Sequence, residues 1–212
     1  RGTAESRALA ATGDEAAARD LVARLRRGES EPVSAIQALG DSGYEAAGPA
    51  VLARAKDSRP EVRGAAAEAL GKLGGESPDV AAALHLLLRD ESSFVRLKAA
   101  GALHRIGEPA GLPVLREVAA ADEPLSRLAA ADAMSSRPDA EWMALVTSLT
   151  GVDSPEARLG AASLIAPYDP DLARKVAESL SGDPNPAIRE IATRLYADTA
   201  AEGGLTSLRT LL

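Results

Sequence analysis

Apolar residues recur along this chain at spacings of three and four, which is the period of an amphipathic α-helix. In the first clear copy the apolar face consists of Val62, Ala65, Ala66, Ala69, Leu70 and Leu73. Another amphipathic run precedes this one, and the same pairing of runs returns several times along the chain. The pattern therefore predicts an all-α protein in which each pair of runs packs as an antiparallel helical hairpin.

One short motif recurs in these pairs: an Asp, a few turn-forming residues, an apolar residue, an Arg and an Ala-rich run. The aspartates are Asp57, Asp90, Asp122, Asp153 and Asp183. The arginines are Arg63, Arg96, Arg127, Arg158 and Arg189, at spacings of 33, 31, 31 and 31. In the third and fourth copies one residue fewer separates Asp from Arg. A repeat of this length indicates stacked supersecondary units.

The repeats predict a single domain over residues 1–212, an α-solenoid (superhelix) of about six stacked antiparallel helical hairpins. Residues 12–43 are expected to form an N-terminal capping repeat, because Ala-Leu-Gly at 38–40 echoes 69–71 but the Arg is missing. Residues 44–199 are expected to hold five repeats. Residues 200–212 are expected to add a C-terminal cap helix after a break at Gly203-Gly204.

Capping signals mark the expected helix ends. Thr12 and Glu15 have the spacing of a capping box, and Ser77 and Asp169 each precede a Pro at a helix start. The glycines expected to end helices in the left-handed conformation are Gly71, Gly74, Gly107 and Gly151.

The motif Asp-x4-Val-Arg-x2-Ala-Ala-x-Ala-Leu-Gly resembles the HEAT repeat, in particular the short bacterial variety of the phycobilisome-lyase-type HEAT-like family. The resemblance extends over roughly residues 12–199. It implies a scaffold with a protein-binding surface, and second helices that line a concave face. In the third and fourth copies Ser126 and Ala157 replace the usual Val or Ile.

The repeated Asp and Arg residues have two interpretations, a row of charged functional sites or a structural ladder. An Arg at the start of a second helix can reach the Asp or the carbonyl groups of a neighbouring turn, and charge-assisted hydrogen bonds would then join successive repeats. The family resemblance implies the same role. We favour the ladder, because a functional site is expected once and not in every copy.

We expect binding residues at positions that are equivalent in successive second helices but differ in residue type from copy to copy. Such a set of positions is called a column here. One residue after each Arg the column contains Leu97, Leu128 and Leu159, which would form an apolar strip on the concave face for a peptide or an amphipathic helix. The polar residues expected around the strip are His104, Arg105, Asp132 and Arg194. The alternative is that the leucines seal gaps between second helices, beside Gly101 and Gly160.

Composition narrows the chemistry. A formal charge of −7 disfavours nucleic-acid binding, which requires a basic surface. The chain has no Cys and only two His, so we expect no metal site, and His85 is expected to be a half-buried packing residue. No nucleotide-binding or nucleophile motif is present in the sequence. We therefore expect no cofactor and no enzymatic activity.

The longest apolar stretch, residues 80–88, is shorter than the roughly 18 residues that a membrane span needs. We expect a soluble protein in the cytoplasm, or in the periplasm if a leader has been removed before Arg1. Lys occurs only at positions 56, 72, 98 and 175, and this preference for Arg fits coding in a high-GC bacterium.

The expected function is that of a non-catalytic scaffold or adaptor, whose partner is another protein or a peptide segment. Two alternatives stay open. One is a phycobilin-lyase-like or other enzyme built on HEAT-like repeats, which the resemblance suggests. The other is a self-assembling structural subunit, and hence a homo-oligomer.

Overall fold

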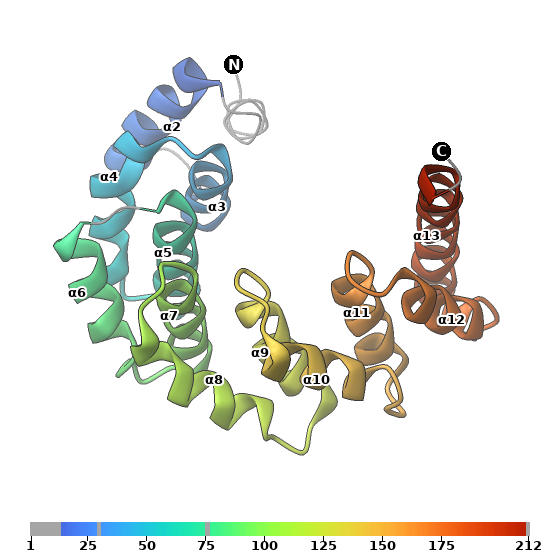
Figure 1. Cartoon of the computed structure of the whole chain (residues 1–212). Helices are drawn as coiled ribbons and strands as arrows, with labels where there is room; N and C mark the ends of the chain where they lie inside the picture. Colours follow the sequence, from blue (N-terminus) through green and yellow to red (C-terminus); the bar gives the residue numbers. More distant parts are fainter. Residues whose placement is uncertain (1–13, 29–30, 75–76, 211–212) are drawn as a thin grey trace. The chain divides into compact units, whose positions relative to one another are not determined.

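The computed structural model describes residues 14–28, 31–74 and 77–210, and the elements in these ranges are helices, turns and short loops (Figure 1). Two compact units are formed, residues 1–116 and 117–212. The prediction of a single domain over the whole chain stays a prediction. None of the described helices is long and apolar enough to cross a membrane.

Residues 1–116 contain three hairpins and the start of the next one. The helices are α2 (Glu15–Arg27), α3 (Pro32–Ser42), α4 (Gly48–Leu52), α5 (Pro60–Leu73), α6 (Pro78–Leu87) and α7 (Ser93–Arg105). The short 3-10 helices η1 (Glu45–Ala47) and η2 (Ala53–Lys56) flank α4, and η3 (Pro109–Gly111) follows α7. Figure 1 shows α3, α5 and α7 stacked as one layer, with α4 and α6 in another.

Residues 117–212 contain α9 (Pro124–Met134), α10 (Ala140–Leu149), α11 (Pro155–Ile165), α12 (Pro170–Leu180) and α13 (Pro186–Thr210). Helix α8 (Leu112–Ala119) spans the boundary between the units. The core of this second unit includes Trp142, whose indole nitrogen donates to the carbonyl of Ala131 at 2.8 Å. The Tyr168 ring meets the Trp142 ring edge-on, with 5.2 Å between centroids.

The helix starts follow the sequence signals with one change. Asp14 caps α2, and its carboxylate accepts from the backbone nitrogens of Ala16 and Ala17. The predicted capping-box residue Thr12 lies outside the described residues. Asp169 caps α12 as expected, whereas Ser77 precedes α6 without a side-chain capping bond.

Gly74 and Gly107 follow the ends of α5 and α7 with positive φ of 70° and 88°, as predicted, although ψ of 109° places Gly74 outside the left-handed helical conformation. The prediction is wrong for Gly71 and Gly151, which do not have positive φ. Gly71 lies inside α5 and is buried, so its role is packing.

Glycine and alanine let the second helices of the first unit pack closely. A Cβ added at Gly40 of α3 would lie 2.9 Å from Cα of Ala69 in α5, and one added at Gly71 of α5 would lie 2.8 Å from Cα of Ala102 in α7. Ordinary side chains cannot approach a backbone so closely. The Ala-Leu-Gly run therefore recurs because each Gly admits the next second helix.

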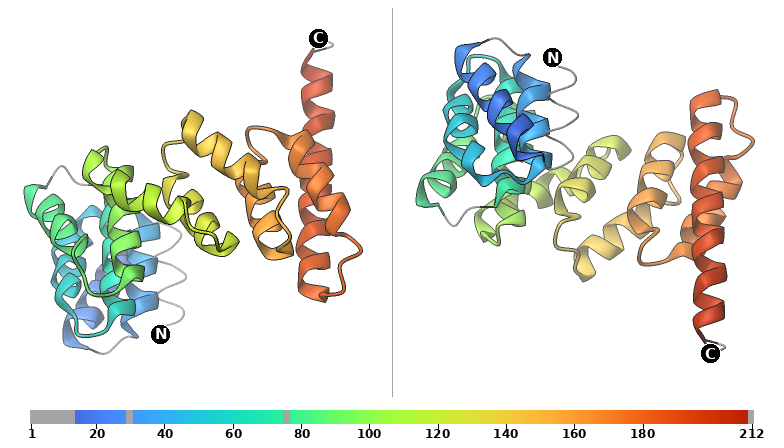
Figure 2. Two further views of the ribbon diagram at one scale, coloured as in Figure 1. Left: turned by 90° about the horizontal axis from the view of Figure 1, so that it is seen from below. Right: turned by 90° about the horizontal axis from the view of Figure 1, so that it is seen from above.

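The predicted separate helix over residues 200–212 is wrong. Helix α13 continues through Gly203-Gly204 to Thr210, as one segment in both views of Figure 2, and residues 211–212 lie outside the described residues. A Gly inside a helix costs only about 1 kcal/mol relative to Ala. Two glycines weaken a helix but do not oblige it to end.

Candidate functional site

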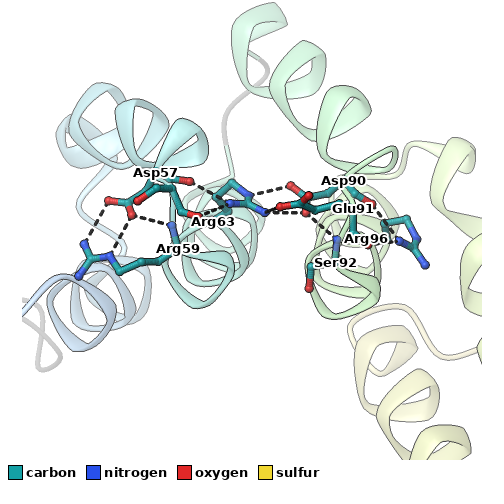
Figure 3. Close-up of polar contacts among 8 residues, drawn as sticks. Asp57, Arg59, Arg63, Asp90, Glu91, Ser92 and Arg96 are labelled. Atoms are coloured by element: carbon teal, nitrogen blue, oxygen red, sulfur yellow. Dashed lines mark hydrogen bonds and ion pairs between the residues drawn. The ribbon is translucent and has the colours of Figure 1, made fainter.

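Arg63, at the start of α5, joins two successive turns of the first unit (Figure 3). Its Nε and Nη2 donate to the two carboxylate oxygens of Asp90 at 2.7 and 2.8 Å. Its Nη1 donates to the carbonyls of Asp57 and Ser58 at 3.0 and 2.9 Å. The two charged side chains are only 11% and 9% exposed. One guanidinium therefore ties the turn before α5 to the turn before α7.

The aspartate in this contact is held in its ionised form. The Arg63 guanidinium, by its hydrogen bonds, lowers the pKa of Asp90, and the backbone N–H of Ser92 acts in the same direction. Asp57 pairs within its own turn. It accepts from Arg59 at 3.0 and 3.2 Å, and that hydrogen-bonded pair lowers the pKa of Asp57.

Two other repeated arginines bind their own turns in the manner of Arg63. Arg96 Nη1 donates to the carbonyls of Asp90 and Glu91 at 2.9 and 3.0 Å. Arg189 Nη1 donates to the carbonyls of Asp183 and Pro184 at 2.7 and 3.0 Å. In these copies, as at Arg63, the Arg follows the Asp by six positions, which places the guanidinium over the two carbonyls of the turn.

In the third and fourth copies, where Asp and Arg are one position closer in the sequence, the Arg donates to a different acceptor. Arg127 donates to the hydroxyl of Ser148 at 2.6 Å, and Arg158 donates to the hydroxyl of Ser179. Both serines lie 21 positions after their Arg, in the first helix of the following hairpin. Within the described part of residues 117–212, neither Arg forms an ion pair with Asp122, Asp153 or Asp183. In the shorter copies a serine hydroxyl of the next hairpin thus takes the place of the two turn carbonyls that Arg63, Arg96 and Arg189 bind.

The predicted apolar strip is more buried than expected. Leu97 of α7 is partly exposed, and so is Leu128 of α9. A Cβ added at Gly160 of α11 would collide with the Leu128 side chain, so Leu128 fills the gap left by this glycine. Leu159 is only 5% exposed, and the prediction that it belongs to an exposed strip is wrong. Leu128 follows the alternative interpretation, in which leucines seal the spaces between second helices.

The polar residues predicted around the strip are at the surface. Asp132, Arg105 and Arg194 are exposed, and His104 is partly exposed. Arg194 forms an i, i+4 pair with Glu190 at 3.1 Å. His85 is exposed, so its prediction as a half-buried packing residue is wrong.

A chain of charges that the sequence analysis missed crosses α3, α5 and α7. Lys72 contacts Asp41 at 2.9 Å and Glu68 at 2.8 Å, and Lys98 contacts Glu68 at 2.6 Å. The contacts between helices join residues 31 and 30 positions apart, close to the repeat period. That spacing of opposite charges was the available signal. Two of the four lysines of the chain are used in this network, which holds the second helices together.

Glu68 should make stability depend on pH. Burial alone raises the pKa of Glu68, but hydrogen bonds from Lys72 and Lys98 outweigh burial and lower that pKa from 4.5 to about 2. Because the folded-state pKa is lowered, ionised Glu68 stabilises the fold above about pH 4.5, and this stabilisation is lost as the pH falls toward 2. We expect Glu68→Gln to lower the free energy of unfolding by about 1–2 kcal/mol at pH 7, after allowance for solvent screening. Urea denaturation at several pH values measures this.

The control for this prediction is Glu61→Gln, since Glu61 is an exposed acid on the same helix. Glu61 lies in the first turn of α5, so this variant should lose only the roughly 0.3–1 kcal/mol of a helix-dipole interaction. The difference between Glu68→Gln and the wild type should shrink below pH 4.5. A difference that stays constant down to pH 3 would contradict the assignment.

An apolar groove lies between α4 and α6, outside the layer of second helices. Its volume is about 660 Å³, and an adjoining hollow of about 390 Å³ shares Pro49, Leu52 and Asp79 with it. The groove walls carry the small residues Ala53, Ala55, Ala82 and Ala83. Leu86 lines it and is 70% exposed. Small side chains and the shortness of α4 leave this space open.

Opposite charges stand at the two ends of the groove. Pro49 and Asp79 line both hollows and Glu45 lines the smaller one, whereas Lys56 lines only the larger one, which also reaches Leu86 and Leu87. Within the described ranges, Lys56 and Asp79 form no ion pair or side-chain hydrogen bond. Sequence reasoning missed the groove because residues 80–88 are apolar on nearly all sides. The available signal was the spacing of Val80, Leu84 and Leu87, which are four and three positions apart and form the buried face of α6. Leu86 does not lie on that face.

Across the described residues, no group of three or more His, Asp or Glu side chains is arranged to hold a metal ion.

The profile of HEAT repeats matches residues 32–85 and 76–135. The chain is a HEAT-repeat protein. The resemblance drawn from the Asp–Arg motif is therefore confirmed, together with the all-α solenoid of sequential helical pairs. No curated protein matches the sequence.

Two solved structures are reported for comparison. The HEAT-repeat chain is similar to the complex of CpcE and CpcF of phycocyanin lyase from Nostoc sp. PCC7120, with a TM-score of 0.60, 19% identity, and coverage of 93% of this chain and 88% of that chain. It is also similar to human deoxyhypusine hydroxylase in complex with glycerol, with a TM-score of 0.43, 19% identity, and coverage of 92% and 79%. At 19% identity, the likeness to the phycocyanin lyase structure concerns the fold alone.

Proposed function

We propose that this HEAT-repeat chain is a non-catalytic scaffold or adaptor that binds another protein. Stacked hairpins bury their apolar faces on one another and present an extended surface to partners. The observation that carries the proposal is the groove between α4 and α6, where Leu86 is 70% exposed. A large exposed aliphatic side chain in an apolar depression is a common feature of protein-binding surfaces.

The face of the second helices is the other candidate surface of the first unit. Phe94 is 46% exposed there, and the ammonium of Lys98 lies 5.9 Å from the centre of its ring. Leu97 is partly exposed on the same helix. The groove is the stronger candidate, because the lysines and acids of the second-helix face bind one another whereas Lys56 and Asp79 of the groove do not.

The partner proposed is a protein or a peptide segment. The solved CpcE and CpcF relatives form a complex with each other, which supports the idea that a HEAT-like chain of this size acts together with a second protein. Self-assembly is the alternative use of the same surface. It predicts that the mass in solution rises with concentration, and light scattering over a hundredfold range of concentration would measure it.

We expect Leu86→Glu to abolish capture of the partner from native lysate of the source cells, because the charge would occupy an apolar surface. The readout is the set of co-purified proteins identified by mass spectrometry. Leu97→Glu tests the second-helix face in parallel, and Leu125→Glu is the matched control, since Leu125 is 46% exposed but lies on α9.

Circular dichroism melts must show that each variant still folds. Loss of the same partners from Leu97→Glu and not from Leu86→Glu would move the binding surface to the second helices. Retention of every partner by both variants would contradict binding at either surface.

A phycobilin-lyase-like activity is the enzymatic alternative. Its test is incubation of the chain with a free bilin and an acceptor protein, followed by absorption spectroscopy of the denatured acceptor. Covalent transfer of the chromophore would replace the scaffold proposal.

A further inference from the structure

We propose that the α4–α6 groove binds an amphipathic α-helix of the partner, with a basic residue at the end near Asp79 and Glu45 and an acidic residue at the end near Lys56. This inference rests on the proposed scaffold function and specifies the chemistry of the partner. It predicts a helix with apolar residues at i, i+3 or i+4, and i+7, flanked by opposite charges.

The shape of the groove favours a helix. Its walls are α6, which has 10 residues, and the segment from α4 to the end of η2. At a rise of about 1.5 Å per residue, a wall of this length accommodates roughly three turns of a partner helix. The four alanines in the walls have small side chains, which leave room for the side chains of a partner helix.

The helical environment disfavours an extended peptide. A strand needs the unpaired backbone groups of a sheet edge, whereas α4 and α6 are helices, whose backbone groups bond mainly within the helix. An extended backbone buried in an apolar groove would lose its hydrogen bonds with water. A helix satisfies its own backbone and needs only an apolar stripe.

The charges give the groove a direction. The starts of α4 and α6 lie at the same end, because Pro49 and Asp79 line both hollows. Acids therefore stand at this end and Lys56 at the other. A partner helix that runs parallel to α6 places its positive N-terminal dipole near Asp79 and its negative C-terminal dipole near Lys56. A hydrocarbon chain would use the apolar floor but not two opposite charges.

The test is a selection of 14-residue helical peptides on the full 212-residue chain, with the Leu86→Glu variant used to remove peptides that bind elsewhere. We expect the enriched peptides to share the apolar spacing above, with a base at one end and an acid at the other. No enrichment, or enrichment of sequences without this pattern, would overturn the inference.

A charge exchange tests the direction. For an enriched peptide, the double variant Lys56→Glu with Asp79→Lys should lose at least about tenfold in affinity, which is the change expected from one or two misplaced charges at a binding surface. Exchange of the two end charges of the peptide should restore most of the loss. Failure of this restoration would overturn the charge assignment. Leu125→Glu should bind as the wild type does.

Other occupants give different results. Saturable binding of a fluorescent C16 fatty acid that is lost in Leu86→Glu, without peptide enrichment, would assign the groove to a lipid. A dimer that dissociates in Leu86→Glu would assign it to a second copy of the chain. If lysate partners depend on Leu97 while the peptide selection fails, the scaffold function stands and this inference falls.

Discussion

Arg63→Ala is expected to lower the free energy of unfolding by about 3 kcal/mol at pH 7, because removal of one partner leaves a poorly solvated charge without compensation. The substitution removes two hydrogen bonds to Asp90 and two to carbonyls of the preceding turn. The Asp90 carboxylate is only 9% exposed, and after the substitution it keeps the hydrogen bond from the backbone N–H of Ser92. Urea denaturation followed by circular dichroism measures the loss.

The pH dependence separates this mechanism from a general loss of packing. The pKa of Asp90 is lowered in the wild type, so the ionised carboxylate stabilises the fold above its ordinary pKa of 3.8, and this contribution is lost as the pH falls below that value. The wild type and Arg63→Ala should therefore approach each other in stability at low pH. The double variant Arg63→Met with Asp90→Asn should be more stable than Arg63→Ala, since it buries no charge. A double variant as unstable as the single one would contradict the explanation.

The repeat period located the contacts between hairpins but not their chemistry. Regular spacing of Arg63 and its four counterparts predicted their common place at the start of a second helix. It could not predict that Arg127 and Arg158 bind serine hydroxyls, because the acceptor depends on where a shorter turn places the guanidinium. A change of one position between Asp and Arg is visible in the sequence, but its effect is decided in three dimensions.

The candidate surface was harder to predict than the hairpins. Helical periodicity separates buried from exposed positions only where apolar and polar residues alternate. In residues 80–88 most positions are apolar, so Leu86 looked like the rest of the run, although it is the most exposed large apolar residue in the described part of the chain. Leu159 was misassigned for the opposite reason. Its column was expected to face outward, whereas it is buried in the second unit.

The distances between neighbouring helices depend on glycine residues, which have no Cβ atom. Gly40 and Gly71 draw α3, α5 and α7 together, while no comparable pair draws α4 toward α6. Close packing of one layer and wider spacing of the other leave room for the groove. His104 stands where the earlier copies have Gly40 and Gly71, so the run of glycines ends with α5. The sequence shows these positions plainly, but Gly71 in such a run predicts a helix end and not a close contact between helices.

Gly71→Val is expected to lower the free energy of unfolding by about 3 kcal/mol, at the upper end of the usual cost of overpacking a core. The new side chain would meet the Ala102 backbone, since even a Cβ would lie 2.8 Å from its Cα. Backbone atoms cannot move aside as a flexible side chain can, so α5 and α7 must separate. That separation would strain the Lys98–Glu68 contact, which joins the same two helices at 2.6 Å.

A graded series identifies the cause. Gly71→Ala adds one methyl group and gains about 1 kcal/mol of helix propensity, so it should still destabilise the chain, but by less than valine. Gly48→Ala is the matched control. A Cβ added at Gly48 of α4 would meet no neighbouring atom within 4 Å, whereas one added at Gly71 would meet the Ala102 backbone. The control should leave stability unchanged or raise it. If Gly71→Ala also raised stability, the helix propensity of alanine would outweigh contact with Ala102, and the second helices would not be as closely packed as this explanation of the groove requires.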